Sequence, residues 1–386
     1  MTKQTPDGQS AFPFREMLAG LAALGVAFAV GAYANAFAAF VLLPVAAGVC
    51  TVSFFRGLSR RAKPTGWMAL VAGNALILAL LLSLLFLGFE TYYRFICDRT
   101  DAMGNTLVSA AWYEKYFHKN SLGLRDDLDY PMSLTPGRRR ITFVGDSFTA
   151  GFGVKHVADR FVNRIRQLHP EWEVHAAAKP GLDTSTEVDL MHTLTVSNHY
   201  QLDVVVLVYQ INDIGEVMPG WKNGYERLMA DGFRNSWLCR NSYFVNLFYH
   251  RWQLRQNSYT QNYFDEIEAA YKGPLWEIEQ IGLLAFQNLT RIRGGRQLLV
   301  VTFPYMDQAM RFKSVHEQLG RYWKGCGVPH LDLLPVFSNL PPAKIVANPH
   351  DAHPNEYAHQ LAAHAIDEFL RRVITQAPQA ADASAR

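Results

Sequence analysis

Two separate stretches of the chain carry the three side chains that nucleophilic catalysis by a serine requires. The stretch ITFVGDSFTAGFGV, residues 141–154, holds Ser147 directly after an apolar run. The stretch NPHDAHPN, residues 348–355, holds Asp351 and His353 two positions apart. A serine hydroxyl becomes a good nucleophile when a histidine takes its proton and a carboxylate orients that histidine. We therefore predict Ser147 as nucleophile, His353 as base and Asp351 as the residue that orients the base.

Two further segments offer hydrogen-bond donors for the oxyanion that forms during acyl transfer. Asn212, in VLVYQINDI, follows an apolar run and has a side-chain amide that can donate. Gly181, in AAAKPGLDTSTE, has no Cβ, so its backbone N–H can come close to a substrate. Both are ordinary turn residues when taken alone. Their position after apolar runs makes them candidates for an oxyanion hole.

A metal site is an alternative use of the histidine-rich stretch. His350, His359 and His364 lie close in sequence to His353. The chain has no HExxH motif, and the spacing of His353, His359 and His364 does not place all three on one face of a helix. The chain also has no CxxC pair. We therefore expect no metal ion and no other cofactor.

The catalytic candidates follow segments that have the length and composition of buried strands. Apolar runs cover residues 141–144, 204–208, 298–303 and 331–334. Helical patterns lie between these runs, for example over residues 275–292. Nearly continuous apolar strands that alternate with helices are typical of an α/β fold with a doubly wound parallel sheet. Such sheets bind ligands at the carboxyl ends of their strands, which is where Ser147 is expected.

Two long runs near the N-terminus lack charged side chains. Residues 17–55 and 67–89 contain no Asp, Glu, Lys, Arg or His. One helix over the first run would be about 58 Å long, nearly twice the hydrocarbon thickness of roughly 30 Å. We therefore predict three transmembrane helices, over about 17–34, 36–55 and 67–89.

Basic residues indicate the orientation of these spans. The loop RGLSRRAKP, residues 56–64, has four basic residues and no acidic one. The positive-inside rule places this loop, and with it the N-terminal tail 1–16, in the cytoplasm. Everything after residue 89 is then outside. A cleaved signal peptide is the alternative, but no cleavage-like site stands out and two further spans follow.

The exported part has three predicted regions. Residues 90–140 form a connector with a small extended element that includes NSLGLRD at 120–126. Residues 141–376 form the catalytic domain, with an insertion at about 214–292. Residues 377–386 form a disordered tail. The aromatic residues of the insertion either pack it onto the core or form a substrate wall: Trp221, Trp237, Tyr243, Phe244, Phe248, Trp252, Tyr263, Tyr271 and Trp276.

Charge and cysteine content limit the partners of the exported part. A net charge of +3 is too small to indicate binding to nucleic acid. Cys50 lies within the second predicted span, whereas Cys97, Cys239 and Cys326 follow the third. Three exported cysteines allow at most one internal disulfide, and the sequence does not say which two would form it.

Taken in order, four blocks of the sequence resemble the SGNH hydrolases, also called GDSL-type esterases. The blocks are GDSFTAG, KPGLDT, QIND and DAHPN. The resemblance spans roughly residues 120–370 and does not cover the predicted spans; NSLGLRD ahead of GDSFTAGFGV is similar to an exported bacterial branch of the family. Together with the predicted spans, this implies a bacterial inner-membrane protein with a periplasmic or extracellular catalytic domain. It implies an oxyanion hole formed by Gly181, Asn212 and the Ser147 N–H. Gln210 stands where the family has glycine, and one residue rather than two separates Asp351 from His353.

The resemblance implies a membrane-anchored serine esterase that removes O-acyl groups, above all O-acetyl, from envelope or secreted polysaccharide, or that cleaves a lipid ester. An O-acyltransferase that passes the acyl group to a glycan would share the chemistry up to the acyl-enzyme. A non-catalytic glycan-binding or scaffold subunit of a membrane synthesis complex is a third alternative. Small residues in the first two spans would suit packing against partner membrane proteins.

Overall fold

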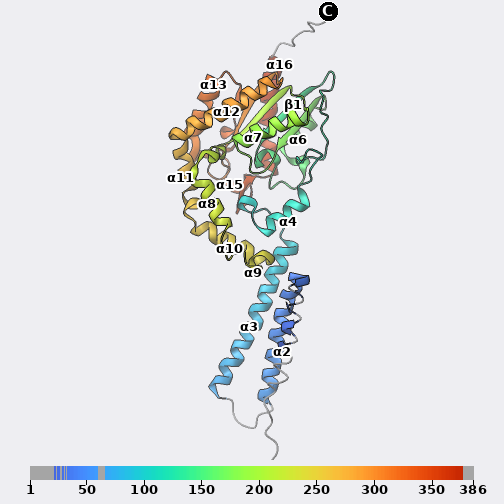
Figure 1. Ribbon diagram of the computed structural model, residues 1–386, viewed down its shortest axis with the longest axis vertical. Helices are drawn as coiled ribbons and strands as arrows, with labels where there is room; N and C mark the ends of the chain where they lie inside the picture. Colours follow the sequence, from blue (N-terminus) through green and yellow to red (C-terminus); the bar gives the residue numbers. More distant parts are fainter. Residues whose placement is uncertain are drawn as a thin grey trace, which may run out of the picture. The chain divides into compact units, whose positions relative to one another are not determined.

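The computed structural model describes residues 21–22, 24–26, 28–29, 31, 33–59 and 66–376. The chain divides into two compact units (Figure 1). The first comprises Met1–Asp98 and Gly232–Arg251, and the second comprises Arg99–Asp231 and Trp252–Arg386. The predicted tails 1–16 and 377–386 lie outside the described residues, as do the basic residues at positions 60–63.

Two long apolar helices belong to the first unit. Helix α2 covers Ala36–Ser59 and helix α3 covers Trp67–Thr91, followed by a π-helical turn, η1, at Tyr92–Ile96. Both are long and apolar enough to cross a membrane, judged by length and composition. They correspond to the predicted spans 36–55 and 67–89. The described residues thus contain two such helices rather than the predicted three. The predicted span 17–34 is described only in part, at residues 21–22, 24–26, 28–29, 31 and 33–34.

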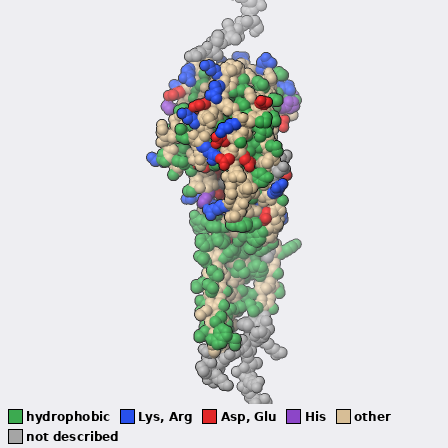
Figure 2. Space-filling model, turned by 90° about the vertical axis from the view of Figure 1, so that its left-hand side faces the viewer, with side chains coloured by type: hydrophobic (Ala, Val, Ile, Leu, Met, Phe, Trp, Pro, Cys, Tyr) green, Lys and Arg blue, Asp and Glu red, His purple; other side chains and the backbone are tan. Residues whose placement is uncertain are grey.

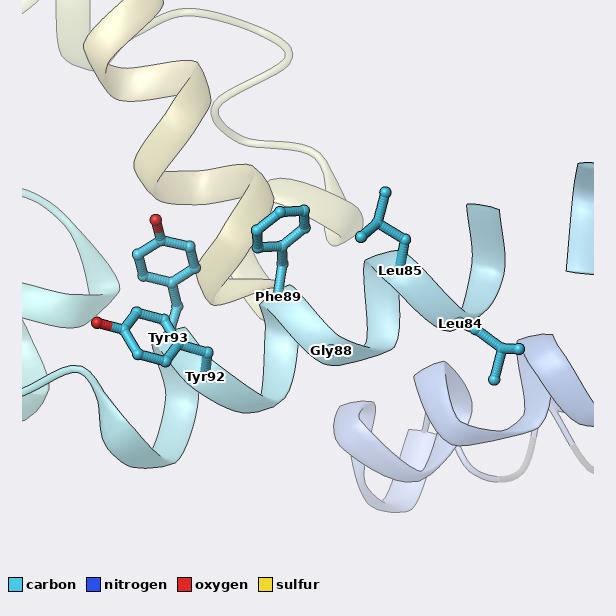
Figure 3. Close-up of a pocket in the computed structure, with 6 residues that line it drawn as sticks. All are labelled: Leu84, Leu85, Gly88, Phe89, Tyr92 and Tyr93. Atoms are coloured by element: carbon cyan, nitrogen blue, oxygen red, sulfur yellow. The ribbon is translucent and has the colours of Figure 1, made fainter. Parts of the chain in front are cut away.

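Few side chains of α2 and α3 are buried, unlike those of a core helix. Hydrophobic side chains cover much of the surface of these helices (Figure 2). A groove of about 490 Å³ runs along α3 and its π-helical turn (Figure 3), lined by Leu84, Leu85, Gly88, Phe89, Tyr92 and Tyr93. An exposed apolar helix surface of this kind suits contact with lipid.

The segment Gly232–Arg251, although it falls within the predicted insertion, groups with these helices. It contains helix α9 (Trp237–Asn241) and the start of α10 (Tyr243–Gln256). The ring of Phe244 stacks on that of Phe89, with 5.0 Å between centroids. The buried Glu90 carboxylate accepts hydrogen bonds from the Ser242 hydroxyl (2.7 Å) and from the Phe244 N–H (3.1 Å). Glu90 therefore binds the N-terminus of α10 to α3.

The second unit is built on a five-stranded parallel sheet, which confirms the predicted α/β fold. The strand order is β2-β1-β3-β4-β5. The strands are β1 (Arg139–Gly145), β2 (Trp172–Ala178), β3 (Val204–Gln210), β4 (Gln297–Phe303) and β5 (His330–Asp332). The sequence analysis missed β2, because Glu173 and His175 interrupt its apolar pattern. This strand order is that of a flavodoxin-like doubly wound sheet.

Alternate side chains of each strand enter two separate hydrophobic cores, one on each face of the sheet. Val205 and Leu207 of β3 lie in one core, and Val204 and Val206 lie in the other. The first core is covered by α7 (Thr184–His192), α11 (Ser258–Lys272), α12 (Pro274–Ile292) and α13 (Lys313–Gly325). The second is covered by α6 (Phe161–Leu168), α14 (Leu334–Phe337) and α16 (Glu356–Gln376). Burial on both faces explains why the strands are almost continuously apolar.

Shorter elements complete the second unit. The remaining α-helices are α4 (Leu107–Tyr116), α5 (Ser147–Ala150), α8 (Pro219–Met229) and α15 (Pro342–Ile345). A hairpin pairs β6 (Val346–Asn348) with β7 (Asp351–Pro354). Short 3₁₀ and π-helical turns are η2 (Ala102–Gly104), η3 (Val157–Asp159), η4 (Thr193–Ser197), η5 (Ile211–Val217) and η6 (Ala309–Phe312).

The aromatic residues of the predicted insertion have two different environments. Trp221, Tyr263, Tyr271 and Trp276 pack into or against the first core, as the packing interpretation requires. Those at positions 237–248 belong to the first unit. No disulfide joins the four cysteines, all of which lie in the described part of the chain.

Candidate active site

Ser147 lies in a tight turn directly beyond the carboxyl end of β1. The turn needs glycine at position 145, because a Cβ there would lie 2.3 Å from the Thr149 Oγ1 and 3.0 Å from the Val208 carbonyl oxygen. Ser147 begins the one-turn helix α5, whose N-cap is Asp146. The Asp146 Oδ1 accepts the Phe148 N–H at 2.8 Å. This cap holds Ser147 at the edge of the sheet, where it is 9% exposed.

Ser147, His353 and Asp351 form one hydrogen-bonded line. The Ser147 Oγ lies 2.9 Å from the His353 Nε2. The His353 Nδ1 lies 2.5 Å from the Asp351 Oδ1, which also accepts the His353 backbone N–H at 3.1 Å. This is the arrangement in which a histidine can take the serine proton while a carboxylate fixes its tautomer. The structure thus brings together three residues that the sequence analysis chose from positions far apart.

The β6–β7 hairpin explains why a spacing of two residues suffices for Asp351 and His353. Both residues lie in strand β7, just before α16. Alternate residues of a strand point to the same side, so the two side chains meet without a turn between them. In β6, Asn348 pairs with Asp351 across the hairpin.

Burial and charge act in opposite directions on the His353–Asp351 pair. Burial alone would lower the pKa of His353, but the Asp351 charge and its hydrogen bond outweigh burial and raise that pKa above its ordinary value. Burial would raise the pKa of Asp351, but the His353 charge and hydrogen bonds from His353 and Thr100 hold it below its ordinary value. Asp351 is therefore ionised at neutral pH, as an orienting carboxylate must be.

Asp146 is a second carboxylate beside Ser147. Its Oδ2 lies 3.3 Å from the Ser147 Oγ, farther than the His353 Nε2. Burial raises the pKa of Asp146 to about 6, against the opposing effects of the Phe148 N–H and the His353 charge. The carboxylate faces the helix N-terminus and the hydroxyl, so its first role is to shape the turn.

Gly181 and Asn212 follow strands on either side of β1. Parallel pairing puts Gly145, Ala178 and Val208 at one level. Gly181 follows β2 with a left-handed φ of 80°, and no atom lies within 4 Å of the position of a Cβ. Asn212 lies in the turn after β3. The carboxyl ends of β2, β1 and β3 thus carry Gly181, Ser147 and Asn212 along the same edge of the sheet.

Gln210, where the family has glycine, shapes the turn that holds Asn212. Its Oε1 accepts the Asn212 N–H at 2.8 Å, and its own N–H donates to the Asp213 Oδ2 at 3.0 Å. These reciprocal bonds form a capping box at the start of the η5 turn. The departure from glycine therefore keeps Asn212 at the strand end.

The other histidines of the C-terminal stretch lie apart from this line. His359 is buried, and its Nδ1 accepts the Phe161 N–H at 3.2 Å. His364 lies on the exposed side of α16, 3.4 Å from the Glu368 carboxylate. The His350 N–H donates to the Asn348 side chain at 3.0 Å. Within the described ranges, no group of three or more His, Cys, Asp or Glu side chains could hold a metal ion.

The sequence analysis missed two residues of the connector that support the site. The Thr100 hydroxyl donates to the Asp351 Oδ2. Arg125, from the NSLGLRD motif, is 1% exposed and donates to the carbonyl oxygens of Gly151 and Val154, in the loop after α5. The NSLGLRD motif was a signal that could have led to Arg125, whereas no local pattern marked Thr100.

This chain is similar in fold to several solved structures of known proteins. No family model matches the sequence, and no curated protein matches it either. A solved structure of a putative lipolytic protein of the G-D-S-L family from Desulfitobacterium hafniense DCB-2 is 12% identical (TM-score 0.39; 60% of this chain, 100% of that one). A two-domain esterase active on acetylated mannans, crystallised with mannopentaose, is 15% identical (TM-score 0.35; 62% of this chain, 50% of that one). A G-D-S-L lipolytic protein from Veillonella parvula DSM 2008 is 16% identical (TM-score 0.36; 62% and 99%).

Proposed function

We propose that this protein is a membrane-anchored serine esterase of the SGNH type that acts on O-acyl esters of envelope or secreted polysaccharide, with O-acetyl as the expected acyl group. The continuous hydrogen-bonded line from Ser147 through His353 to Asp351 carries the proposal. A buried aspartate, a histidine and a serine in this order have a clear chemical use in acyl transfer.

The proposed reaction has two halves. The His353 Nε2 takes the Ser147 proton as the Oγ attacks the ester carbonyl carbon, and the resulting oxyanion accepts hydrogen bonds from the Ser147 and Gly181 N–H groups and the Asn212 amide. His353 then gives its proton to the departing alcohol, which leaves an acyl-serine. Water, deprotonated by His353, then attacks the acyl carbon. The bond between this carbon and the Ser147 Oγ breaks as His353 returns the proton to the Oγ, which releases the carboxylic acid and free Ser147.

The anchor in this proposal consists of three spans. Helices α2 and α3 have the length and composition for two of them, and residues 17–34 would form the first. The basic loop after α2 assigns the N-terminus to the cytoplasm. The proposed catalytic domain, residues 141–376 with connector 90–140, would then lie on the periplasmic or extracellular side of the bacterial inner membrane, where acylated polysaccharide is within its reach.

An O-acyltransferase is the second candidate, because a sugar hydroxyl could replace water as the acceptor. A scaffold subunit of a polysaccharide synthesis complex is the third, but such a role does not need an activated serine. The distinction between esterase and transferase depends on which acceptor reaches the acyl-serine.

Fluorophosphonate labelling of the full-length protein in detergent micelles tests the proposal. We expect labelling at Ser147, located by mass spectrometry, and its loss in Ser147→Ala and His353→Ala. Release of acetate from an O-acetylated polysaccharide would then identify an esterase, and transfer of acetyl to an added glycan would identify a transferase. A well-folded protein in which Ser147 does not label would contradict both enzymatic candidates.

A further inference from the structure

We propose that Thr100 is a positioning residue that holds the Asp351 carboxylate in the plane in which it orients His353. The inference rests on the proposed function, because it assigns Thr100 a part in the same reaction. Thr100 acts through Asp351 and has no contact of its own with the nucleophile in this assignment.

The two oxygens of Asp351 have separate donors. Oδ1 accepts both hydrogen bonds from His353, one from the ring and one from the backbone. Oδ2 accepts the hydroxyl of Thr100. Asp351 is 2% exposed and Thr100 is 4% exposed, so water has little access to replace this donor. A carboxylate held by donors at both oxygens cannot rotate without breaking a buried hydrogen bond.

The backbone of Thr100 is attached to the same hairpin. The Asn348 side chain donates to the Thr100 carbonyl oxygen at 2.9 Å, and Asn348 is the residue that pairs with Asp351 across the hairpin. On the other side, the N–H of Asp101 donates to the Ser109 Oγ at 2.7 Å. The hydroxyl of Thr100 is thus fixed relative to the strand that carries the carboxylate.

The loop after α5, which contains Gly153, also packs against Thr100 and the β6–β7 hairpin. A Cβ at Gly153 would lie 2.8 Å from the Ala347 Cβ, 3.7 Å from the Thr100 Oγ1 and 3.8 Å from the His353 Cβ. Thr100 therefore lies where three segments meet: the connector, the loop after α5 and the β6–β7 hairpin.

Loss of the Thr100 hydroxyl should change the chemistry of His353. Without this donor, the charge of Asp351 is less dispersed and attracts the imidazolium more strongly, while the carboxylate gains freedom to rotate. The first effect raises the pH at which His353 becomes a base, and the second slows the reaction at all pH values. Besides Asp351, the acidic group that acts on His353 is Asp146, which the substitution does not touch.

The test measures the rate constant of fluorophosphonate labelling at Ser147 against pH in the full-length protein. Thr100→Val keeps the size of the side chain and removes the hydroxyl, Thr100→Ser keeps the hydroxyl, and Thr100→Ala serves if the valine variant does not fold. Thr290→Val is the matched control. Thr290 is also buried and lies in the same unit, but its hydroxyl donates to the Phe286 carbonyl oxygen within α12.

We expect Thr100→Val to slow labelling about 10-fold, as for a hydrogen bond to a charged group, and to move the acid limb of the profile to higher pH. Thr100→Ser should restore both. A loss of rate without movement of the limb, or the same profile in Thr290→Val, would reduce Thr100 to a structural role. If Ser147 is labelled in the wild type and Thr100→Val shows the same labelling rate at every pH, only the inference about Thr100 fails. If the wild type does not label at Ser147, the proposed function fails first and the inference with it.

Discussion

The second unit contains two groups of buried acidic side chains that differ in their hydrogen-bond donors. Asp351 has donors at both carboxylate oxygens. Glu187, Asp213 and Glu279 are equally buried, yet each has at least one carboxylate oxygen with no hydrogen-bond partner among the described residues. Burial raises the pKa of Glu187 and Asp213 well above their ordinary values, and it raises the pKa of Glu279 to about 7. The pKa of Asp351 is lowered instead.

This comparison shows that burial alone does not decide whether a buried carboxyl group is charged, because the charge and hydrogen bonds of a partner can outweigh it. Glu279 accepts the hydroxyls of Thr184 at 2.6 Å and Tyr209 at 3.2 Å, both at one oxygen. Neutral donors at a single oxygen do not compensate for desolvation. Asp351 has the positive partner that makes its charge stable, and only Asp351 is in a position to orient a base.

The largest expected effect comes from removing Ser147, the proposed nucleophile, whose hydroxyl is hydrogen-bonded to His353. Ser147→Ala should lower turnover by about 10⁶-fold, as in other serine triads, and His353→Ala should do the same. Initial-rate measurements on an ester substrate check this. Ser338→Ala, in the same unit and away from the site, should keep the wild-type rate. Substantial turnover by Ser147→Ala would remove Ser147 from the mechanism.

Asp351→Asn replaces the charged carboxylate of Asp351 by a neutral amide, so that position 351 becomes uncharged, as the buried carboxyl groups with raised pKa values tend to be. We expect a loss of about 10⁴-fold in kcat. The sign of the pH effect follows from the Asp351 charge, which raises the pKa of His353, so its removal should move the acid limb of kcat/KM to lower pH. Asp332→Asn is the control, because Asp332 forms a similar pair with His316 at 2.7 Å. An equal loss in both variants would show that the effect is not specific to the triad.

Asn212→Ala tests the predicted oxyanion hole. Its donor, the Asn212 amide, is neutral, in contrast to the charged Asp351 carboxylate. The expected loss is about 3 kcal/mol of transition-state stabilisation, or 10²–10³-fold in kcat, by analogy with other oxyanion donors. KM should change little, since the oxyanion forms only after substrate binds. The exposed Asn288 provides the control variant Asn288→Ala. A full rate in Asn212→Ala would exclude its amide from the hole.

Glu279→Gln tests, through the stability of the fold, whether a buried carboxyl group without a charged partner has a raised pKa. The folded-state pKa of Glu279 lies above its unfolded value, so the stability that this group contributes is complete below about pH 4.5 and is lost as pH rises through about 7. The loss amounts to roughly 3 kcal/mol. Glu279→Gln should therefore raise Tm at pH 8 and leave it nearly unchanged at pH 5. Glu277→Gln, exposed on the same helix, should alter neither value, and a rise in Tm that is equal at both pH values would contradict the assignment.

Local sequence pattern was sufficient for the elements whose environment is uniform along their length. The charge-free runs predicted α2 and α3 because a helix that is apolar on all sides needs no partner to define it. The apolar runs predicted β1, β3 and β4 because these strands are largely buried on both faces of the sheet. The run at 331–334 predicted β5, which is only half-buried. The same reasoning missed β2, in which Glu173 forms a buried ion pair with Arg140 that only the tertiary structure provides.

The sequence by itself determined the chemistry of the candidate site: a serine at a strand end, a His–Asp pair, and an asparagine and a glycine after neighbouring strands. Residue type limits what each side chain can do, so these candidates were visible without coordinates. Only the tertiary structure decided how they are held. Thr100 lies 251 positions from the aspartate that it contacts, and Arg125 reaches a loop almost 30 positions away. Hydrogen bonds between distant segments depend on how the whole unit packs, which no local pattern records.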